Sequence, residues 1–309
     1  MALASPADLP NDAALAEPWT TYRTWAATAR YHKKAIDFWS LWSLRLAIVG
    51  ALFATLGQQV SPLAPHDGPL SILYRIPGVL GSALIALATY FSSQALSGNR
   101  DKIWIRSRSA AESVKSAIFL YRASVPPFDS TDRGAQIRAR VEKVLEQLNE
   151  IPPRVPPAEA LPVLDRLSVD QYIAARVDPS INWYKSRALE YQQKSDRLRT
   201  YTVALGVVTV LLGLASAFTT ISAWSAVIAT IVTSLTAFAQ NQRYQSLLAL
   251  YSATASRLGL LKGDWAQSAK SDNDKADRDA FIQRCEETMA LENGSWIAQW
   301  SQQPPSQTR

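Results

Sequence analysis

Four apolar stretches interrupt a chain that is otherwise rich in polar and charged residues. They cover roughly Leu41–Gly57, Ile76–Leu96, Thr200–Ile221 and Trp224–Gln240. Each approaches the ~20 residues that a helix needs to cross a hydrocarbon layer of ~30 Å. Since that layer holds no water to bond peptide groups, only helices and closed barrels can span it. The stretches are too long, and too rich in small residues, for barrel strands, so the pattern predicts four transmembrane helices.

The alternative is that the four stretches are buried helices of a soluble bundle. The third stretch argues against it, because Tyr201–Ile221 contains no charged residue and no polar stripe. A helix of a soluble protein normally keeps one polar face in water. We therefore expect an all-α integral membrane protein whose first partner is the lipid bilayer.

The distribution of charge predicts the orientation. Asp67 is the only charged residue between Gln58 and Tyr74, whereas about a hundred residues rich in charge separate the second and third stretches. The segment before the first stretch is basic, with Arg23, Arg30, Lys33 and Lys34. Because short cytoplasmic segments carry an excess of Lys and Arg, both hairpin tips are predicted outside and both termini in the cytoplasm. This asymmetry explains the net charge of +6 without a nucleic acid as partner.

The two hairpins resemble each other. Ser82–Ala86 (SALIA) matches Ser225–Ala229 (SAVIA), and at the same offset Arg100 aligns with Arg243. Both copies start on the cytoplasmic side, so they are parallel repeats. This disfavours the inverted-repeat transporters, which bind substrate at the midplane between antiparallel halves. We expect each second span to continue without interruption into the cytoplasm, as a helix of ~40 residues and ~60 Å.

The repeat and the proline content divide the chain. Residues 1–18 are predicted to form a disordered tail, 19–150 a first unit with spans at about 41–58 and 76–96, and 151–168 a proline-rich linker. Residues 169–301 form the second unit, with spans at about 200–221 and 224–240, and 302–309 a loose tail. The loop between the last two spans is expected at Ser222–Ala223.

Four cytoplasmic segments show helical periodicity. A rough a/d spacing predicts a narrow seam for a partner helix, formed by Trp104, Ala111, Val114, Ile118 and Tyr121. An amphipathic helix is predicted over Gln136–Asn149. A third run, Val169–Arg199, should be interrupted near Asp178-Pro179, with Asp178 or Ser180 capping the helix that follows. A last helix is expected over Ala276–Ser301.

Candidate chemistry outside the membrane is sparse. Cys285 is the only cysteine and has no local base, so we interpret it as a packing residue. Ser271–Asp279 has alternate carboxylates but lacks the central glycine and distal glutamate of a calcium loop, which favours a solvated loop that caps the last helix. No phosphate loop, zinc-protease motif or nucleophile elbow is found. The sequence predicts no enzymatic activity, no cofactor and no metal site.

Hydroxyl-bearing residues share one side of each second span. The candidate pore-lining residues are Ser82, Thr89, Ser92, Ser93, Thr230, Thr233, Ser234 and Asn241. Two interpretations remain open: the faces allow helices to pack closely and bond across an interface, or they line a water-filled path in an oligomer. Arg45, about one turn inside the first span, is interpreted as an interfacial anchor that snorkels to the surface. An ion-path or lipid-phosphate contact is its alternative role.

A motif before the second hairpin resembles the SLATT superfamily. It consists of Tyr172, Arg176, Trp183, Tyr184 and Ala188. The resemblance covers about residues 169–300 best, and residues 20–150 are similar to a more divergent SLATT unit. Members often have a glutamine where Pro179 or Ser180 stands here, which is a departure from the pattern.

The resemblance implies a two-span, pore-forming effector of a prokaryotic conflict or antiviral defence system. Because the chain has no recognisable nucleotide-binding domain, its sensor would be a separate cytoplasmic protein or the cytoplasmic stalk itself. Four spans enclose little water alone, so we expect a homo-oligomeric pore or channel in the prokaryotic inner membrane. The alternative is a non-conducting membrane scaffold that presents its cytoplasmic helical stalk to partners.

Overall fold

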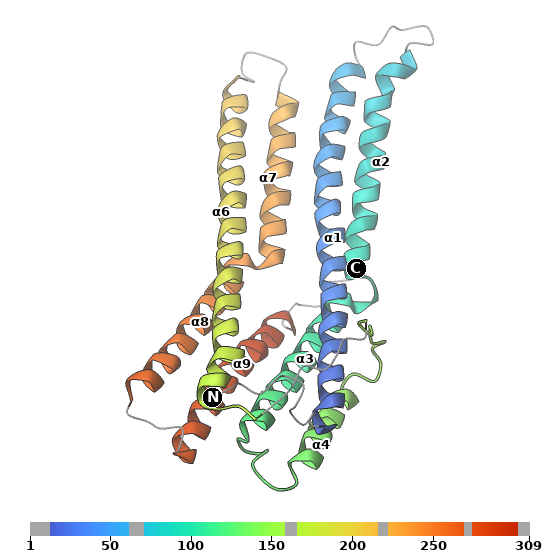
Figure 1. Ribbon diagram of the computed structural model, residues 1–309. Coiled ribbons are helices and arrows are strands. Elements are labelled where there is room, and N and C mark those ends of the chain that lie inside the picture. Colours follow the sequence, from blue (N-terminus) through green and yellow to red (C-terminus); the bar gives the residue numbers. More distant parts are fainter. Residues whose placement is uncertain (1–12, 62–70, 158–165, 216–221, 269–273, 302–309) are drawn as a thin grey trace. The chain divides into compact units, whose positions relative to one another are not determined.

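The computed structural model describes residues 13–61, 71–157, 166–215, 222–268 and 274–301. All regular structure in these ranges is helical (Figure 1), which confirms the all-α prediction for them. A short 3-10 helix at Ala13–Leu15 precedes the first long helix. The α-helices are α1 (Ala16–Val60), α2 (Ser71–Leu96), α3 (Arg100–Ala123), α4 (Arg133–Glu146), α5 (Val169–Tyr172), α6 (Asp178–Ala215), α7 (Ser222–Gln242), α8 (Tyr244–Gln267) and α9 (Lys275–Ser301).

The chain divides into two compact units. Unit 1 comprises Met1–Lys33, Asp101–Ala188 and Ala249–Arg309, and unit 2 comprises Lys34–Arg100 and Leu189–Leu248. Each unit therefore takes segments from both halves of the sequence repeat. The long helices α1 and α6 contribute residues to both units.

Three helical stretches within the described ranges are long and apolar enough to cross a membrane. They are Ala16–Val60, Ile72–Ala123 and Val169–Ala215, and they contain the first three predicted spans as far as Ala215. The fourth predicted span lies in α7, which is helical but is not one of these stretches, so four spans stay a prediction.

Apolar side chains cover the outside of unit 2. Among the described residues, all the exposed large apolar side chains belong to unit 2 except Tyr31, Val155, Trp183, Leu260 and Leu291. On α6, for example, Val203 and Val210 are 60% and 63% exposed. An apolar exterior of this extent is typical of a surface that contacts lipid or another protein. This supports a membrane protein.

The first hairpin is held together by close approach of the two backbones. A β-carbon on Gly57 would lie 2.4 Å from the backbone nitrogen of Gly78, and one on Gly81 would lie 2.3 Å from that of Ala54. Real β-carbons cannot approach so closely, so only glycine fits at these contacts. Small residues permit the same close packing of helices in membranes generally. This contact between α1 and α2 depends on glycines that the sequence pattern did not single out.

Neither second span continues as one straight helix, so the predicted helices of ~40 residues are wrong. After α2, Gly98 and Asn99 have φ angles of 63° and 52°, and α3 starts at Arg100. After α7, Arg243 has a φ of 50°, and α8 starts at the next residue. Gly98 adopts the left-handed region at little cost because it has no β-carbon. The two breaks fall at neighbouring positions of the repeat, because Arg243 aligns with Arg100, the residue directly after the first break.

Two further boundaries differ from the prediction. Residues 13–18, predicted within a disordered tail, are helical, and Leu15 is fully buried against α3 and α4. The predicted turn at Ser222–Ala223 is the first turn of α7. The connection before it lies outside the described residues. The same holds for residues 1–12, the linker residues 158–165 and the tail 302–309.

The interruption predicted near Asp178-Pro179 is a π-helical turn at Ile173–Val177. Neither Asp178 nor Ser180 caps a helix, because the chain is already helical when it reaches them. The cap is Ser168, whose hydroxyl accepts from the backbone N–H of Gln171 while the Gln171 side chain accepts from the N–H of Ser168. This reciprocal pair is a capping box.

The predicted seam on α3 is buried inside unit 1. Its residues Trp104, Ala111, Val114, Ile118 and Tyr121 are at most 4% exposed. All of them except Trp104 belong to a core completed by the start of α1 and by α4, the helix predicted at Gln136–Asn149. The partner helix of the seam is therefore supplied by the same chain.

Candidate functional site

The motif residues of the second unit lie on α5, the π-helical turn and the start of α6. Tyr172 is the last residue of α5, Arg176 lies in the turn, and Trp183 and Tyr184 follow in α6. All but Trp183 are buried, including Ala188 at 7% exposed. A π-turn inserts one extra residue per turn and is frequent at functional positions. Here it precedes the part of α6 that packs in unit 1.

Arg176 forms a bidentate ion pair with Glu286 of α9. Its Nε and Nη2 donate to Oε1 and Oε2 of Glu286, each at 3.0 Å, and the Tyr172 hydroxyl donates to Oε1 at 3.0 Å. The arginine and glutamate side chains are 3% and 4% exposed. Burial alone would lower the pKa of Arg176, but the Glu286 carboxylate outweighs burial and raises it above its ordinary value. The guanidinium therefore stays charged in the interior.

A second ion pair joins Arg108 of α3 to Glu292, also on α9; the arginine side chain is 18% exposed and the glutamate 2%. Nη2 of Arg108 donates to Oε1 of Glu292 at 3.0 Å, and its Nη1 donates to the Tyr251 hydroxyl at 3.1 Å. The Tyr184 hydroxyl donates to Oε2 of Glu292 at 3.2 Å. Trp183 lies beside the guanidinium, with its ring centroid 5.8 Å from Cζ of Arg108. Burial raises the pKa of Glu292 although Arg108 opposes that shift.

Together the two pairs fasten α9 to the rest of unit 1. The motif thus builds an internal network, and its polar atoms bond to one another. Sequence reasoning missed Glu286 and Glu292, because they lie six residues apart and share no helix face with each other. A glutamate that pairs with a distant arginine has the same local pattern as one in water.

Cys285, beside the first pair, confirms the packing prediction. It is fully buried. Burial, and then the neighbouring Glu286 carboxylate, raise the pKa of its thiol to about 12. A thiol with so high a pKa forms almost no reactive thiolate at neutral pH.

The predicted pore-lining residues lie on the outside of unit 2. Exposed side chains are those of Ser82, Thr89, Ser92, Ser93, Thr230 and Thr233, whereas Ser234 is half-buried. The Asn241 side chain lies outside the described atoms. Three hydroxyls donate to the carbonyl four residues earlier, those of Ser82, Thr89 and Thr233, at 3.1, 3.1 and 2.9 Å. Such bonds satisfy the hydroxyl donor within its own helix.

The inward side of α7 is apolar. Val227, Ile231 and Leu235 are each at most 9% exposed and pack against leucine, isoleucine and alanine side chains of α1 and α6. The hydroxyls of Thr230 and Thr233 lie on other sides of the same helix. The buried residues of α7 in this cluster are therefore apolar, whereas Thr230 and Thr233 are exposed and Ser234 is half-buried.

Arg45 is exposed on α1 and stacks on an aromatic neighbour. Its Cζ lies 5.3 Å from the centroid of the Trp42 ring, within the range of a cation–π contact. Tryptophan and arginine are both common at the membrane interface. The role of Arg45 as an interfacial anchor stays a prediction.

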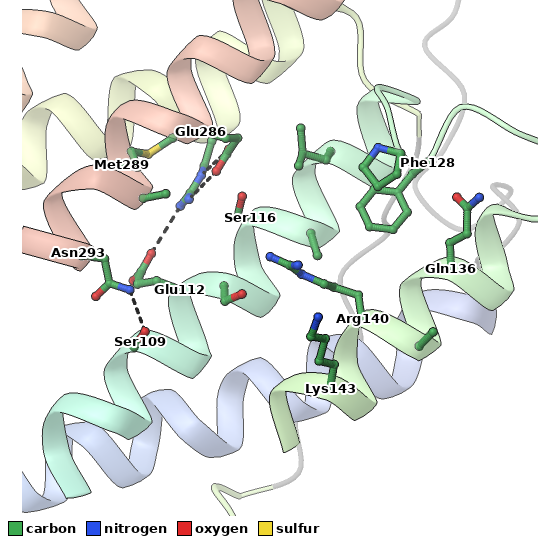
Figure 2. A pocket seen from close by; sticks show the side chains of 18 residues that line it. Ser109, Glu112, Ser116, Phe128, Gln136, Arg140, Lys143, Glu286, Met289 and Asn293 are labelled. Carbon is green, nitrogen blue, oxygen red and sulfur yellow. Dashed lines mark hydrogen bonds and ion pairs between the residues drawn. The ribbon is translucent and has the colours of Figure 1, made fainter. Parts of the chain in front are cut away.

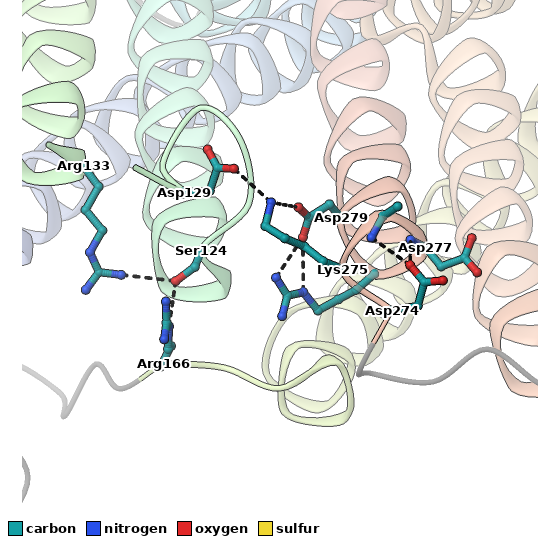
Figure 3. Close-up of polar contacts among 10 residues, drawn as sticks. Ser124, Asp129, Arg133, Arg166, Asp274, Lys275, Asp277 and Asp279 are labelled. Atoms are coloured by element: carbon teal, nitrogen blue, oxygen red, sulfur yellow. Dashed lines mark hydrogen bonds and ion pairs between the residues drawn. The ribbon is translucent and has the colours of Figure 1, made fainter. Parts of the chain in front are cut away.

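Asp274, the described residue directly before α9, caps that helix, as predicted for the acidic segment (Figure 3). Asp274 Oδ1 accepts from the backbone N–H groups of Ala276 and Asp277, at 3.0 and 3.3 Å. Lys275 bridges Asp129 and Asp279 at 2.9 and 2.8 Å. No group of three or more His, Cys, Asp or Glu side chains in the described ranges is arranged to hold a metal ion.

Two family models match the chain. The SMODS and SLOG-associating 2TM effector domain 3 (SLATT_3) matches residues 26–168, and the corresponding domain 1 (SLATT_1) matches residues 172–296. Comparisons with curated proteins and with solved structures found no match. SLATT effector domains are associated with conflict and defence systems. The two matched ranges agree with two fused units, so this chain belongs to the SLATT family and carries two SLATT domains in tandem.

Proposed function

We propose that this tandem SLATT protein forms a pore across a prokaryotic inner membrane, as an effector of a conflict system, and that several copies assemble to make it. The observation that carries the proposal is the outward position of the hydroxyl faces. Thr230 and Thr233 are exposed on α7, and Ser82 and Thr89 on α2. In our proposal this polar face on an otherwise apolar exterior is covered by the matching face of another copy.

The apolar packing around α7 supports a path between copies rather than through one chain. Its buried residues Val227, Ile231 and Leu235 pack against apolar side chains of α1 and α6. If the outward faces of several copies meet at a common axis, their hydroxyls form rings around it. Such a path carries hydroxyls but no carboxylate or ammonium, so it should discriminate weakly between ions.

The alternative function, a non-conducting scaffold, was based on an exposed seam on the cytoplasmic stalk. The seam from Trp104 to Tyr121 was the surface expected to receive a partner, and it is buried by α1 and α4 of the same unit. In our proposal the termini and unit 1 lie in the cytoplasm, a separate protein senses the signal, and the chain catalyses no reaction. The ion pairs of Glu286 and Glu292 then hold α9 in place on the cytoplasmic side.

A bulky residue on the hydroxyl face should block conduction. We expect Thr233→Trp to lower ion release from reconstituted liposomes by about tenfold or more, because a hydrophobic ring dewets a narrow path. Val210→Trp is the matched control, since Val210 is 63% exposed on the apolar face of α6. That variant should keep the parental rate. Equal rates for both variants, at equal assembly size, would contradict the proposed pore lining.

A further inference from the structure

Unit 1 contains a cavity of about 710 Å³ between α3, α4 and α9. The proposed pore does not involve this cavity. Figure 2 shows side chains from the three helices converging on it. A neighbouring cavity of about 240 Å³ lies along α3 and α4. The two share the lining residues Ser109, Ser113, Arg140 and Lys143. The two cavities therefore adjoin at these four residues, and we refer to them together as the crevice.

The charges around the crevice are unevenly satisfied. Its two carboxylates both pair with Arg176. Oε2 of Glu112 lies 3.9 Å from Nη1 of that arginine, and Oε1 of Glu286 lies 3.0 Å from its Nε. Arg140 and Lys143 are exposed and make no hydrogen bond or ion pair with any residue in the described ranges. They are three residues apart on α4, so they lie on one face of that helix. Two cations thus remain available at the crevice for an anion from outside the chain.

Serine hydroxyls line the same cavity as these cations. Ser113 and Ser116 of α3 line the large cavity opposite α4, and Figure 2 shows Arg140 extending from α4 toward that side. Ser109 is engaged by Asn293, whose Nδ2 donates to its hydroxyl at 3.2 Å. A guanidinium, an ammonium and several hydroxyls around one space suit a tetrahedral oxyanion, which accepts many charge-assisted hydrogen bonds.

The other part of the large cavity is apolar. It is lined by Leu120, Pro127, Phe128 and Met289. Gln136 also lines it, and its Oε1 is buried without a hydrogen-bond partner, while its Nε2 donates to Ser130. A pocket that combines apolar walls with a few convergent polar groups is the usual form of a small-molecule site. The unpaired acceptor of Gln136 would suit a ligand that carries a donor.

We propose that this crevice binds a phosphate ester with a small apolar or aromatic body. Arg140, Lys143 and the α3 hydroxyls hold the phosphate, and Phe128 and Met289 contact the body. The phosphate could come from a soluble ester or from a lipid headgroup. The proposal is independent of conduction, since it concerns binding to unit 1 alone.

The test measures ligand-induced shifts of the melting temperature of the full-length protein in a neutral detergent. The probes are inorganic phosphate, phenyl phosphate and dihexanoyl phosphatidylglycerol. Any ligand that binds the folded state preferentially raises the melting temperature. We expect phenyl phosphate to bind more tightly than inorganic phosphate, because only the ester reaches the apolar wall. Equal binding of the two would contradict the role of that wall.

Arg140→Gln is expected to weaken binding of phenyl phosphate by about tenfold, the effect of losing one charge-assisted hydrogen bond. Arg138→Gln is the matched control, because Arg138 is exposed on the same helix but lines neither cavity. If the Arg140→Gln protein does not fold, Lys143→Gln takes its place, and we expect the same weakening of phenyl phosphate binding. Tighter binding of the phosphatidylglycerol probe would identify a lipid headgroup, and tighter binding of phenyl phosphate a soluble ester. Absence of any shift at millimolar probe, or equal effects of the Arg138 and Arg140 variants, would overturn the proposal.

Discussion

Replacing Glu286 with alanine is expected to destabilise the protein by about 3–5 kcal/mol, the cost of leaving a buried charge without its partner. The variant removes both bonds to Arg176 and the bond from Tyr172. Arg176 is only 3% exposed, so water cannot replace the lost carboxylate. Thermal unfolding followed by tryptophan fluorescence in detergent measures the effect.

Glu287→Ala is the control for this prediction. Glu287 is the next residue of α9 and is exposed, so its loss should change stability by about 0.5 kcal/mol or less. The double change Arg176→Met and Glu286→Leu should recover much of the loss, because apolar residues of similar size carry no desolvation cost. Equal destabilisation by Glu286→Ala and Glu287→Ala would show that the ion pair does not fasten α9.

Alanine at the glycines of the first hairpin should have the second large effect. Gly57→Ala and Gly81→Ala each place a β-carbon within 2.5 Å of the opposite backbone, so the helices must separate. We expect a loss of about 1–3 kcal/mol, typical of overpacking, together with a smaller monodisperse fraction in size-exclusion chromatography.

The same substitution on α6 should act in the opposite direction. A β-carbon on Gly206 or Gly213 meets no atom within 4 Å, and alanine favours a helix over glycine by about 0.5–1 kcal/mol. Gly206→Ala should therefore be neutral or stabilising. If Gly81→Ala and Gly206→Ala change stability with the same sign, the close packing of α1 on α2 is not as the structure shows.

The spacing of apolar residues predicted the helices because a helix that packs on a core has its apolar side chains on one face. The helix expected over Gln136–Asn149 is α4, Arg133–Glu146, and the seam from Trp104 to Tyr121 is indeed buried. The partner of that seam could not be predicted, since the spacing of apolar residues does not say which helix covers them.

Features that depend on long-range pairing were not visible in the sequence. Glu286 and Glu292 have the local pattern of solvated residues, and only the positions of Arg176 and Arg108 give them a role. The break at Arg243 has no signal in its residue type, although its aligned partner lies just after the break at Gly98. The repeat could have shown this, because a glycine break in one copy predicts a break in the other.

The hydroxyl faces were identified by spacing, and the structure places most of them on the exterior of unit 2. Their assignment to a pore concerns contacts between copies, which the packing within one chain does not determine. Each exposed hydroxyl that donates to its own helix carbonyl could face lipid, a neighbouring helix or water. The discriminating property is therefore access to water in the assembled state.

Water access at Thr233 can be measured directly with a Thr233→Cys variant in conducting liposomes. The native thiol adds little background, because Cys285 is buried and its pKa is raised to about 12. If the hydroxyl faces line the path, a membrane-impermeant cationic thiol reagent will modify Thr233→Cys and reduce ion flux, while Val210→Cys will stay unmodified. A Thr233→Cys protein that conducts but reacts no faster than Val210→Cys would contradict a pore lined by these faces.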